Sequence, residues 1–261
     1  MTSIHLIRHT DHDWIERGLA GRLAVPLNDD GVRQAEALGR WYAGQRVECL
    51  WASPLRRTMQ TADPIARALG LEIRTADELL EVDFGAWEGK EFIDLDHDPA
   101  WPRWNTARGR ARAPGGETIA AVQARVCGFI NDLCDRDPHG SHVLVSHGDP
   151  IRAALAYYLG VPIDLFLRIE VYPGSISLLA IDGCAPRILR MNGSVEDGSL
   201  PPAPSPAGAS PHPRARHRGS SSGPVSAARR GGGGTGGTRL SLQRGPALRT
   251  PGLPVRGFHR E

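Results

Sequence analysis

Apolar and polar positions follow two different periods along the first 195 residues. Short apolar runs predict strands at residues 4–8, 47–52, 71–74, 142–146, 175–181 and 187–191. Apolar positions spaced three and four apart predict helices over residues 31–41, 55–69, 118–134 and 151–159. Gly70 stands where a left-handed residue commonly ends a helix. Strands that alternate with helices predict an α/β three-layer sandwich, with a mostly parallel sheet and helices on both faces.

The pattern ends near residue 195, where Pro, Gly, Ser and Arg take over. Such a composition has too few large apolar residues to offset the entropy of ordering. We therefore assign residues 1–195 to one domain and residues 196–261 to a disordered tail. Residues 201–261 hold ten Arg and one Glu, a net charge of +9, which leaves −7 for the rest of a chain whose total is +2.

The basic tail has two interpretations. It is either a polycation that contacts nucleic acid or acidic partners, or a dispensable extension of an Arg-biased chain. We favour the second, because the tail has only Phe258 to stack on bases. Nucleic-acid binding by the domain is not expected.

No run of residues approaches the roughly 18 apolar positions of a membrane span. The N-terminus also lacks the basic start and apolar core of a signal peptide, so we expect a cytoplasmic protein without membrane contact. The cysteines are scattered without a CxxC pair, at Cys49, Cys127, Cys134 and Cys184. Two of them fall in a helical apolar pattern and are interpreted as buried thiols.

The chemistry-bearing residues come directly after predicted strands. Arg8-His9-Thr10 follows the first strand, the segment from Ser53 to Thr58 the second, and His147-Gly148-Asp149-Pro150 the strand at 142–146. Because ligands of open α/β sheets bind at the carboxyl ends of strands, we expect these segments to converge. Two arginines and two histidines would make an anion site there.

Two predicted helix starts support this anion site. Ser53 before Pro54 and Asp149 before Pro150 are typical N-caps, and each helix would aim free N–H groups at the sheet edge. Arg57 lies one turn into its helix, and its side chain would lean back to bind phosphate in a bidentate fork. An acidic, aromatic loop at residues 78–89 offers a carboxylate whose pKa an apolar setting would raise, as a general acid needs.

These segments resemble, in order, the signatures of the histidine phosphatase (phosphoglycerate mutase-like) superfamily. The similar segments are Arg8-His9-Thr10, residues 53–62, residues 81–89, Pro114-Gly115-Gly116-Glu117-Thr118 and Ser146-His147-Gly148, within a match over residues 3–192. The resemblance implies the phosphoglycerate mutase-like fold and hydrolysis of a small phosphomonoester through a phosphohistidine. It implies no cofactor and no metal, since arginines and histidines would stabilise the charge.

The resemblance also implies a role for each matching residue. His9 is the nucleophile, and Arg8 and Arg57 clamp the phosphoryl oxygens. His147 adds a hydrogen bond and, if protonated, a positive charge, with Gly148 beside it against the substrate.

The acid role falls to Glu81, which would protonate the leaving oxygen and then deprotonate water. Asp83 is the rival, but the family's spacing points to Glu81.

Three departures from the family pattern bear on activity. Thr10 replaces the usual Gly, as in enzymes of the α-ribazole phosphatase type. Ile15 stands where the family's mutases carry an Asn, so that contact is lost or supplied elsewhere, with Arg22 as the candidate. The loop at Glu81 also lacks the mutase E-R-x-Y-G pattern. This loop and Ile15 both favour hydrolysis over mutase transfer.

Three alternatives stay open. One is a metal cluster formed by His9, Asp11, His12 and Asp13 with His147, although the spacing differs from that of metallo-hydrolases. The others are a non-catalytic phosphate-ligand binder and a cofactor-dependent phosphoglycerate mutase-type transfer. A transfer assay with a bisphosphate primer would separate the last from hydrolysis.

Substrate selectivity is expected from the segments at residues 11–25 and 90–113. The second holds aromatic and basic side chains that either grip a substrate or belong to a capping subdomain: Trp101, Arg103, Trp104, Arg108, Arg110 and Arg112. The sequence itself predicts neither the substrate nor an oligomeric state.

Overall fold

A six-stranded mixed sheet forms the centre of the computed structural model, which describes residues 1–183 and 185–195. Its strands lie in the order β3-β2-β4-β1-β5-β6. They comprise β1 (Thr2–Arg8), β2 (Cys49–Ala52), β3 (Ile73–Thr75), β4 (Ser141–Ser146), β5 (Ile176–Asp182) and β6 (Ala185–Gly193). Strands β3, β2, β4 and β1 run parallel, whereas β5 and β6 add antiparallel pairs at one edge. The predicted mostly parallel α/β sheet is confirmed.

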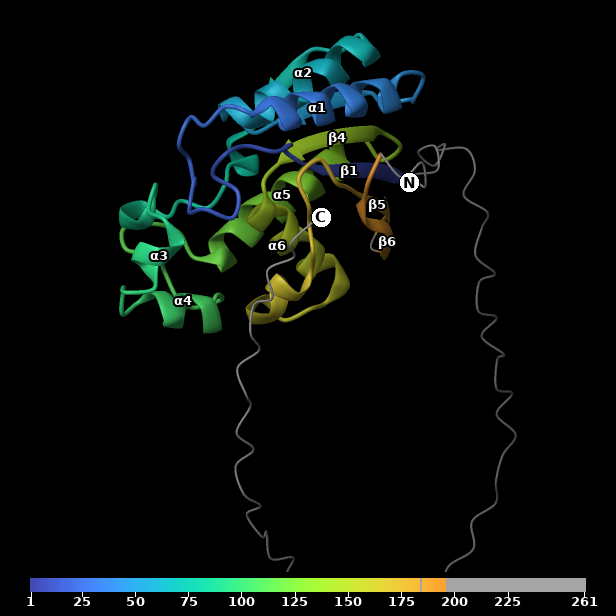
Figure 1. The fold of residues 1–261 in the computed structure, drawn as a ribbon. Coiled ribbons are helices and arrows are strands. Elements are labelled where there is room, and N and C mark those ends of the chain that lie inside the picture. Colours follow the sequence, from blue (N-terminus) through green and yellow to red (C-terminus); the bar gives the residue numbers. More distant parts are fainter. Residues whose placement is uncertain (184, 196–261) are drawn as a thin grey trace, which may run out of the picture. The chain divides into compact units, whose positions relative to one another are not determined.

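Helices cover both faces of the sheet (Figure 1). Helices α1 and α2 lie on one face and α5 and α6 on the other, and their bounds are α1 (Asp29–Tyr42), α2 (Arg56–Leu69), α5 (Ile119–Arg136) and α6 (Gly148–Leu159). Alternating side chains of β1 and β4 divide the core between the two faces. Ile7 and Val143 pack with α1 and α2, whereas Leu6 and Leu144 pack with α5 and α6. The predicted three layers are therefore confirmed.

Local signals determine where α1 begins and where α2 ends. The side-chain oxygen of Asn28 accepts the N–H of Gly31 at 2.8 Å and caps α1. Gly70 ends α2 with φ 67°, the left-handed conformation that favours glycine. The helix stop predicted at Gly70 is confirmed.

The two predicted helix starts at the sheet edge are wrong. Helix α2 begins after Leu55 and α6 after His147, and neither has a side-chain cap. The hydroxyl of Ser53 lies 2.8 Å from Nε2 of His147 and accepts the N–H of Leu55 at 3.5 Å, so it caps no N–H within the helix. Asp149 lies inside the first turn of α6, where its carboxylate accepts a hydrogen bond from Arg152 at 3.2 Å.

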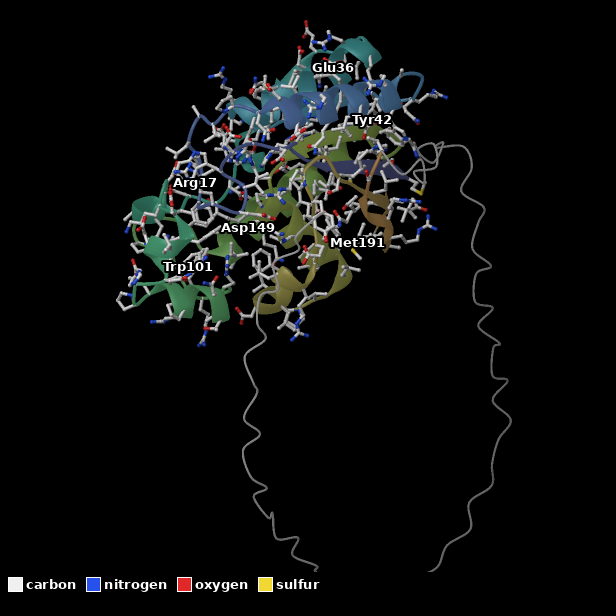
Figure 2. The ribbon with its side chains drawn as sticks, viewed as in Figure 1. Arg17, Glu36, Tyr42, Trp101, Asp149 and Met191 are labelled. Atoms are coloured by element: carbon white, nitrogen blue, oxygen red, sulfur yellow. The ribbon has the colours of Figure 1, made fainter. Side chains whose placement is uncertain are left out.

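Short helices lie within and after the acidic loop at residues 78–89. They are η1 (Asp77–Leu79), η2 (Gly85–Trp87), α3 (Phe92–Leu95) and α4 (Trp101–Thr106), with η3 (Ile163–Arg168) after α6. Trp101 on α4, labelled in Figure 2, packs edge-on against Trp87 with ring centroids 5.4 Å apart. Trp104 lies 5.9 Å from Trp87, and both of these rings are buried. The tryptophans therefore hold this segment to the main core rather than offering a surface for ligand.

Two other predictions concern the thiols and the tail. Cys127 is buried, as interpreted, and burial raises the pKa of its thiol to about 12. Cys134 is half-buried. Cys184 and the predicted tail at residues 196–261 lie outside the described residues. Within the described part of the chain, no helix has the length and apolarity needed to cross a membrane.

Candidate active site

The carboxyl ends of β1 and β4 bring two histidines together. Arg8 and Ser146 are partners in the parallel register, so His9 and His147 follow adjacent strand ends. Their ring centroids are 5.2 Å apart, and the side chains are 2% and 0% exposed. The structure thus joins the two histidines that the strand pattern placed at one sheet edge.

His9 is held in one tautomer. Its Nδ1 lies 2.8 Å from the carbonyl oxygen of Thr10, and because a carbonyl only accepts, Nδ1 carries the proton. Burial, followed by the charges of Arg57 and Arg8, lowers the pKa of His9 well below its ordinary value. The ring is therefore neutral near pH 7, and the lone pair of Nε2 is free for attack.

Two buried guanidiniums lie beside His9. Arg8 donates to the carbonyl of Val171 at 2.7 Å, and Arg57 donates to Gly21 at 2.6 Å and Leu23 at 3.0 Å. Burial lowers the pKa of both guanidiniums, that of Arg57 to about 10. Both nevertheless stay charged near pH 7. The Nε atoms of Arg8 and Arg57 are buried without a partner among the described residues. Each arginine therefore keeps donors for an anion.

A hollow of about 170 Å³ opens beside His9. Five of the predicted site residues line it, namely Arg8, His9, Arg57, Glu81 and Gly148. His12, Trp14 and Phe92 also line it and fall in the two segments expected to select the substrate, whereas the sequence reasoning missed Phe84, Asp149 and Arg152 as substrate contacts. Only Asp149 and Arg152 carried a signal, an acidic and a basic residue three apart at the start of a helix.

Glu81 has the properties of a general acid near neutral pH. It lines the hollow, and its Oε1 accepts the N–H of Val82 at 2.9 Å. Burial, followed by the charge of Asp149, raises its pKa to about 7. Arg57 and Arg8 act in the opposite direction and are outweighed. Glu81 can therefore both release and take up a proton under physiological conditions.

Asp83, the rival acid, is used structurally. Its Oδ1 accepts the N–H of Gly85 at 2.8 Å, and its Oδ2 lies 3.6 Å from Arg22. Asp83 is not among the residues that line the hollow. The geometry agrees with Glu81 as the acid.

His147 lies behind His9 rather than in the wall of the hollow. Burial, followed by the charges of Arg57 and His9, lowers its pKa well below the ordinary value. The ring is therefore neutral in the unliganded protein. A bound phosphoryl dianion would raise this pKa, because an opposite charge favours the protonated form.

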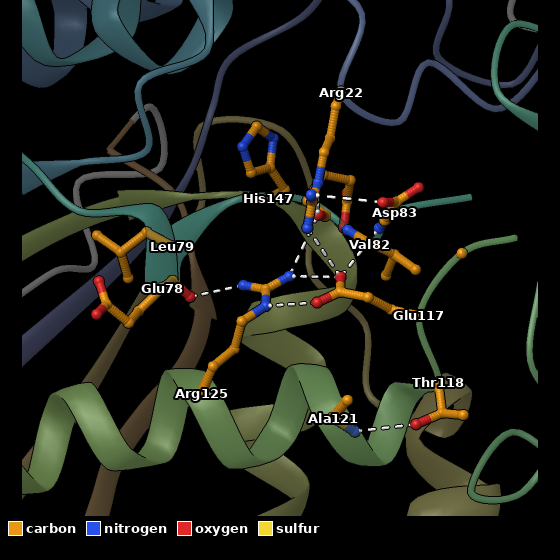
Figure 3. A network of polar contacts seen from close by, with 12 residues as sticks. Arg22, Glu78, Leu79, Val82, Asp83, Glu117, Thr118, Ala121, Arg125 and His147 are labelled. Carbon is orange, nitrogen blue, oxygen red and sulfur yellow. Dashed lines mark hydrogen bonds and ion pairs between the residues drawn. The ribbon is translucent and has the colours of Figure 1, made fainter. Parts of the chain in front are cut away.

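Arg22, Glu117 and Arg125 form a polar network (Figure 3), which also holds the backbone of Glu81. Arg22 donates to the carbonyl of Glu81 at 3.3 Å, and Arg125 donates to the same oxygen at 3.2 Å. Arg125 also donates to the carbonyl of Glu78 at 2.6 Å. Both arginines pair with the carboxylate of Glu117, at 3.0 and 3.2 Å. The network therefore positions the acid without touching the substrate space.

The structure corrects the expectation for Arg22. Its guanidinium is taken up by Glu117, Asp83 and the Glu81 carbonyl, and it does not line the hollow. Ile15 does line the hollow and offers it no donor. Arg22 therefore does not replace the amide that Ile15 lacks.

The segments expected to select the substrate contribute unequally. Lining residues run from His12 to Gly21 in the first segment, whereas the second supplies only Phe92. Arg108, 6% exposed, lies 3.7 Å from Asp149 and over the ring of Trp104, so it belongs to the packing. The interpretation of this second segment as a capping structure is favoured.

The residues of the proposed metal cluster have other partners. Nδ1 of His12 accepts the N–H of Trp14, and Asp13 accepts a hydrogen bond from Asn28 at 3.3 Å. Within residues 1–183 and 185–195, no three His, Cys, Asp or Glu side chains are grouped as metal ligands. The geometry of these side chains therefore favours an anion site.

Comparisons with known proteins point the same way. The family model of the histidine phosphatase superfamily (branch 1) matches residues 4–194. Phosphoserine phosphatase 1 of Hydrogenobacter thermophilus is 31% identical over 195 residues, covering 74% of this chain and 92% of that protein. A probable phosphoglycerate mutase GpmB of Proteus mirabilis is 31% identical over 181 residues, covering 68% and 84%.

Solved structures show the same likeness. A mycobacterial glucosyl-3-phosphoglycerate phosphatase aligns with a TM-score of 0.66 at 25% identity, over 74% of this chain and 99% of its own. A putative α-ribazole-5'-P phosphatase from Escherichia coli aligns with a TM-score of 0.68 at 25% identity, over 74% and 96%. Proteins named as phosphatases therefore resemble this chain in sequence and in fold.

Proposed function

Because the chain belongs to the histidine phosphatase superfamily (branch 1), we propose that it hydrolyses small phosphomonoesters through a phosphohistidine at His9. Phosphomonoester hydrolysis is the activity that its phosphatase relatives have in common. The observation that carries the route is the bond from Nδ1 of His9 to the Thr10 carbonyl, since it leaves the Nε2 lone pair free.

The first step transfers the phosphoryl group to His9. The Nε2 lone pair attacks phosphorus while the bond from phosphorus to the ester oxygen breaks. Glu81, protonated below its pKa of about 7, gives its proton to that leaving oxygen. The alcohol departs and Glu81 becomes a carboxylate.

The second step returns the enzyme to its first state. The Glu81 carboxylate takes a proton from water as the water oxygen attacks phosphorus. The bond from phosphorus to Nε2 breaks, and its electron pair returns to His9. Inorganic phosphate leaves, and the sum of both steps is ester plus water to alcohol plus phosphate.

Fixed positive charge stabilises both transition states. Arg8 and Arg57 are buried beside His9, and such preorganised donors act strongly where water is excluded. The neutral His147 adds polarity next to the nucleophile, and the charge of the bound dianion raises its pKa. The two arginines neutralise the negative phosphoryl charge that a metal would otherwise neutralise. Hydrolysis is therefore expected to persist in excess EDTA.

The proposed substrate class rests on the relatives of this chain. Phosphoserine and phosphoglycerate-type esters are the first candidates, since relatives of this chain are phosphatases of phosphoserine and of glucosyl-3-phosphoglycerate. Mutase-type transfer is less favoured, because Ile15 places no amide in the hollow. A bisphosphate-primed transfer assay is expected to release phosphate rather than isomerised product.

The test compares wild type with His9→Ala on an aryl phosphate in excess EDTA. Turnover by wild type and its loss in the variant would support the proposal. The matched control is His97→Ala, an exposed histidine outside the hollow, which should keep wild-type turnover. Equal activity of wild type and His9→Ala would refute the phosphohistidine route, and silence of both would favour a phosphate-ligand binder.

A further inference from the structure

His12 lies in the active site but has no part in the mechanism above. Its side chain is only 5% exposed, and its ring centroid is 4.9 Å from that of His9. It lines the same hollow as His9, Arg8 and Arg57. A second buried imidazole therefore stands on the wall where the phosphoryl group is transferred.

The backbone fixes the tautomer of His12. The N–H of Trp14 donates to Nδ1 of His12 at 3.2 Å. An N–H group only donates, so Nδ1 is the acceptor and the proton of the neutral ring is on Nε2. Among the described residues the only hydrogen bond of the His12 ring is the one at Nδ1, so the N–H at Nε2 is available to a ligand.

The charges around His12 keep it neutral. Burial, followed by Arg57 and Arg8, lowers its pKa to about 4, although the carboxylate of Asp13 acts in the opposite direction. The same two arginines lower the pKa of His9. Both rings therefore lie within reach of the two cations between which an anionic phosphoryl group is expected.

Neither Ile15 nor Arg22 gives the hollow the donor that an Asn at position 15 would supply. Ile15 presents only carbon atoms to it, and Arg22 is held by Glu117 and Asp83 outside it. His12 is three residues before Ile15 and shares the same wall.

We propose that the Nε2–H of His12 donates a hydrogen bond to an oxygen of the phosphoryl group as that group moves to and from His9. The inference rests on the proposed function of His9 and adds an uncharged donor to the two arginines. An uncharged donor with a fixed direction contributes most where negative charge builds up in the transition state. His12 is then a catalytic residue that contacts the transferred group.

The test uses two replacements of His12 that differ in one property. His12→Leu removes the donor at similar size, whereas the amide nitrogen of His12→Gln reaches about as far as Nε2. The readouts are kcat/KM on an aryl phosphate, the Kd of orthovanadate by calorimetry, and the Tm of each variant. We expect His12→Leu to lose about 10²-fold in kcat/KM and to bind vanadate more weakly, with His12→Gln recovering most of both.

A second-site variant tests the placement. In His12→Leu, the added change Ile15→Asn puts an amide on the same wall and should restore about tenfold of the lost kcat/KM. Wild-type kcat/KM and vanadate Kd in a folded His12→Leu would overturn the inference while leaving the role of His9 intact. Equal losses in Leu and Gln variants would overturn it too, as they indicate packing. Absence of turnover in the wild type would contradict the proposed role of His9. In that case an unchanged vanadate Kd in His12→Leu would still contradict the proposed hydrogen bond from His12.

Discussion

Asp83 and Glu117 are joined by two hydrogen bonds that run in opposite directions. The N–H of Asp83 donates to Oε2 of Glu117 at 3.0 Å, and the N–H of Glu117 donates to the Asp83 carbonyl at 2.8 Å. Glu117 also holds Arg22 and Arg125, which bind the carbonyl of Glu81 (Figure 3). The acidic loop at residues 78–89 is therefore held in place by Glu117, which lies more than one helix further along the chain.

Loss of the Glu117 carboxylate should weaken catalysis more than binding. Glu117→Ala removes the carboxylate that Arg22, Arg125 and the Asp83 N–H share, so the two arginines and Glu81 are less well positioned. We expect kcat on an alkyl phosphate to fall about 10- to 100-fold with a small change in KM. Glu117→Gln keeps an acceptor and should retain more of the rate. A wild-type kcat in Glu117→Ala would argue against the clamp.

Removal of the Glu81 carboxyl should matter most for poor leaving groups. Glu81→Gln has no acidic proton, so hydrolysis of an alkyl phosphate is expected to slow about 10²–10⁴-fold. The phenolate of an aryl phosphate leaves in the first step without a proton from Glu81, so the burst of phenol should survive. Equal slowing of the burst and of alkyl turnover would contradict the role of Glu81 as acid.

The pH profile follows from the same group. The pKa of Glu81 is raised to about 7, so the acid form that starts the reaction disappears as the pH rises above that value. We expect kcat/KM for an alkyl phosphate to fall tenfold per pH unit on the alkaline side. In Glu81→Gln this limb should be absent. An identical alkaline limb in wild type and variant would assign it to another group.

A matched pair of glycines tests the close contact under the acid loop. A Cβ at Gly116 would lie 2.1 Å from the carbonyl oxygen of Asp83, so Gly116→Ala forces the clamp apart. Gly128 in α5 is exposed with no atom near the added Cβ, and Gly128→Ala should stabilise by about 1 kcal/mol through helix propensity. We expect Tm to fall for the first and rise for the second. A rise in both would show that the contact relaxes freely.

Stability should fall in mildly acidic solution because histidines are buried uncharged. His5 is fully buried, with Nδ1 2.9 Å from the hydroxyl of Tyr42, and burial lowers its pKa to about 4. The unfolded chain, with a pKa near 6.5, binds the proton more readily. The stability from His5 is therefore complete above about pH 6.5 and is lost as the pH falls towards 4.

The variant His5→Asn isolates this contribution, since its amide can reach Tyr42 but does not titrate. Urea unfolding of both proteins at pH 4.5, 5.5 and 7 gives the free energies. The wild type should lose more stability between pH 7 and 4.5 than the variant does, by at most about 3 kcal/mol. Parallel curves would show that His5 does not titrate on unfolding in this range.

The local sequence pattern was sufficient to predict the strands and helices and the main residues of the site. Strands and helices depend on periodicities of a few residues, so the runs at 4–8 and 142–146 appear in the structure as β1 and β4. Parallel strands present their carboxyl ends at one edge, which is why His9 and His147 could be expected together before their contact was known.

The partners of polar side chains were decided only by the tertiary structure. Ser53 and Asp149 had good local capping signals, but His147 and Arg152 compete for them once the chain is folded. Arg22 was expected at the substrate and is instead neutralised by Glu117, which lies far along the sequence. Hydrogen bonds and ion pairs form with whatever group the fold brings within about 3 Å, and no local period encodes that choice.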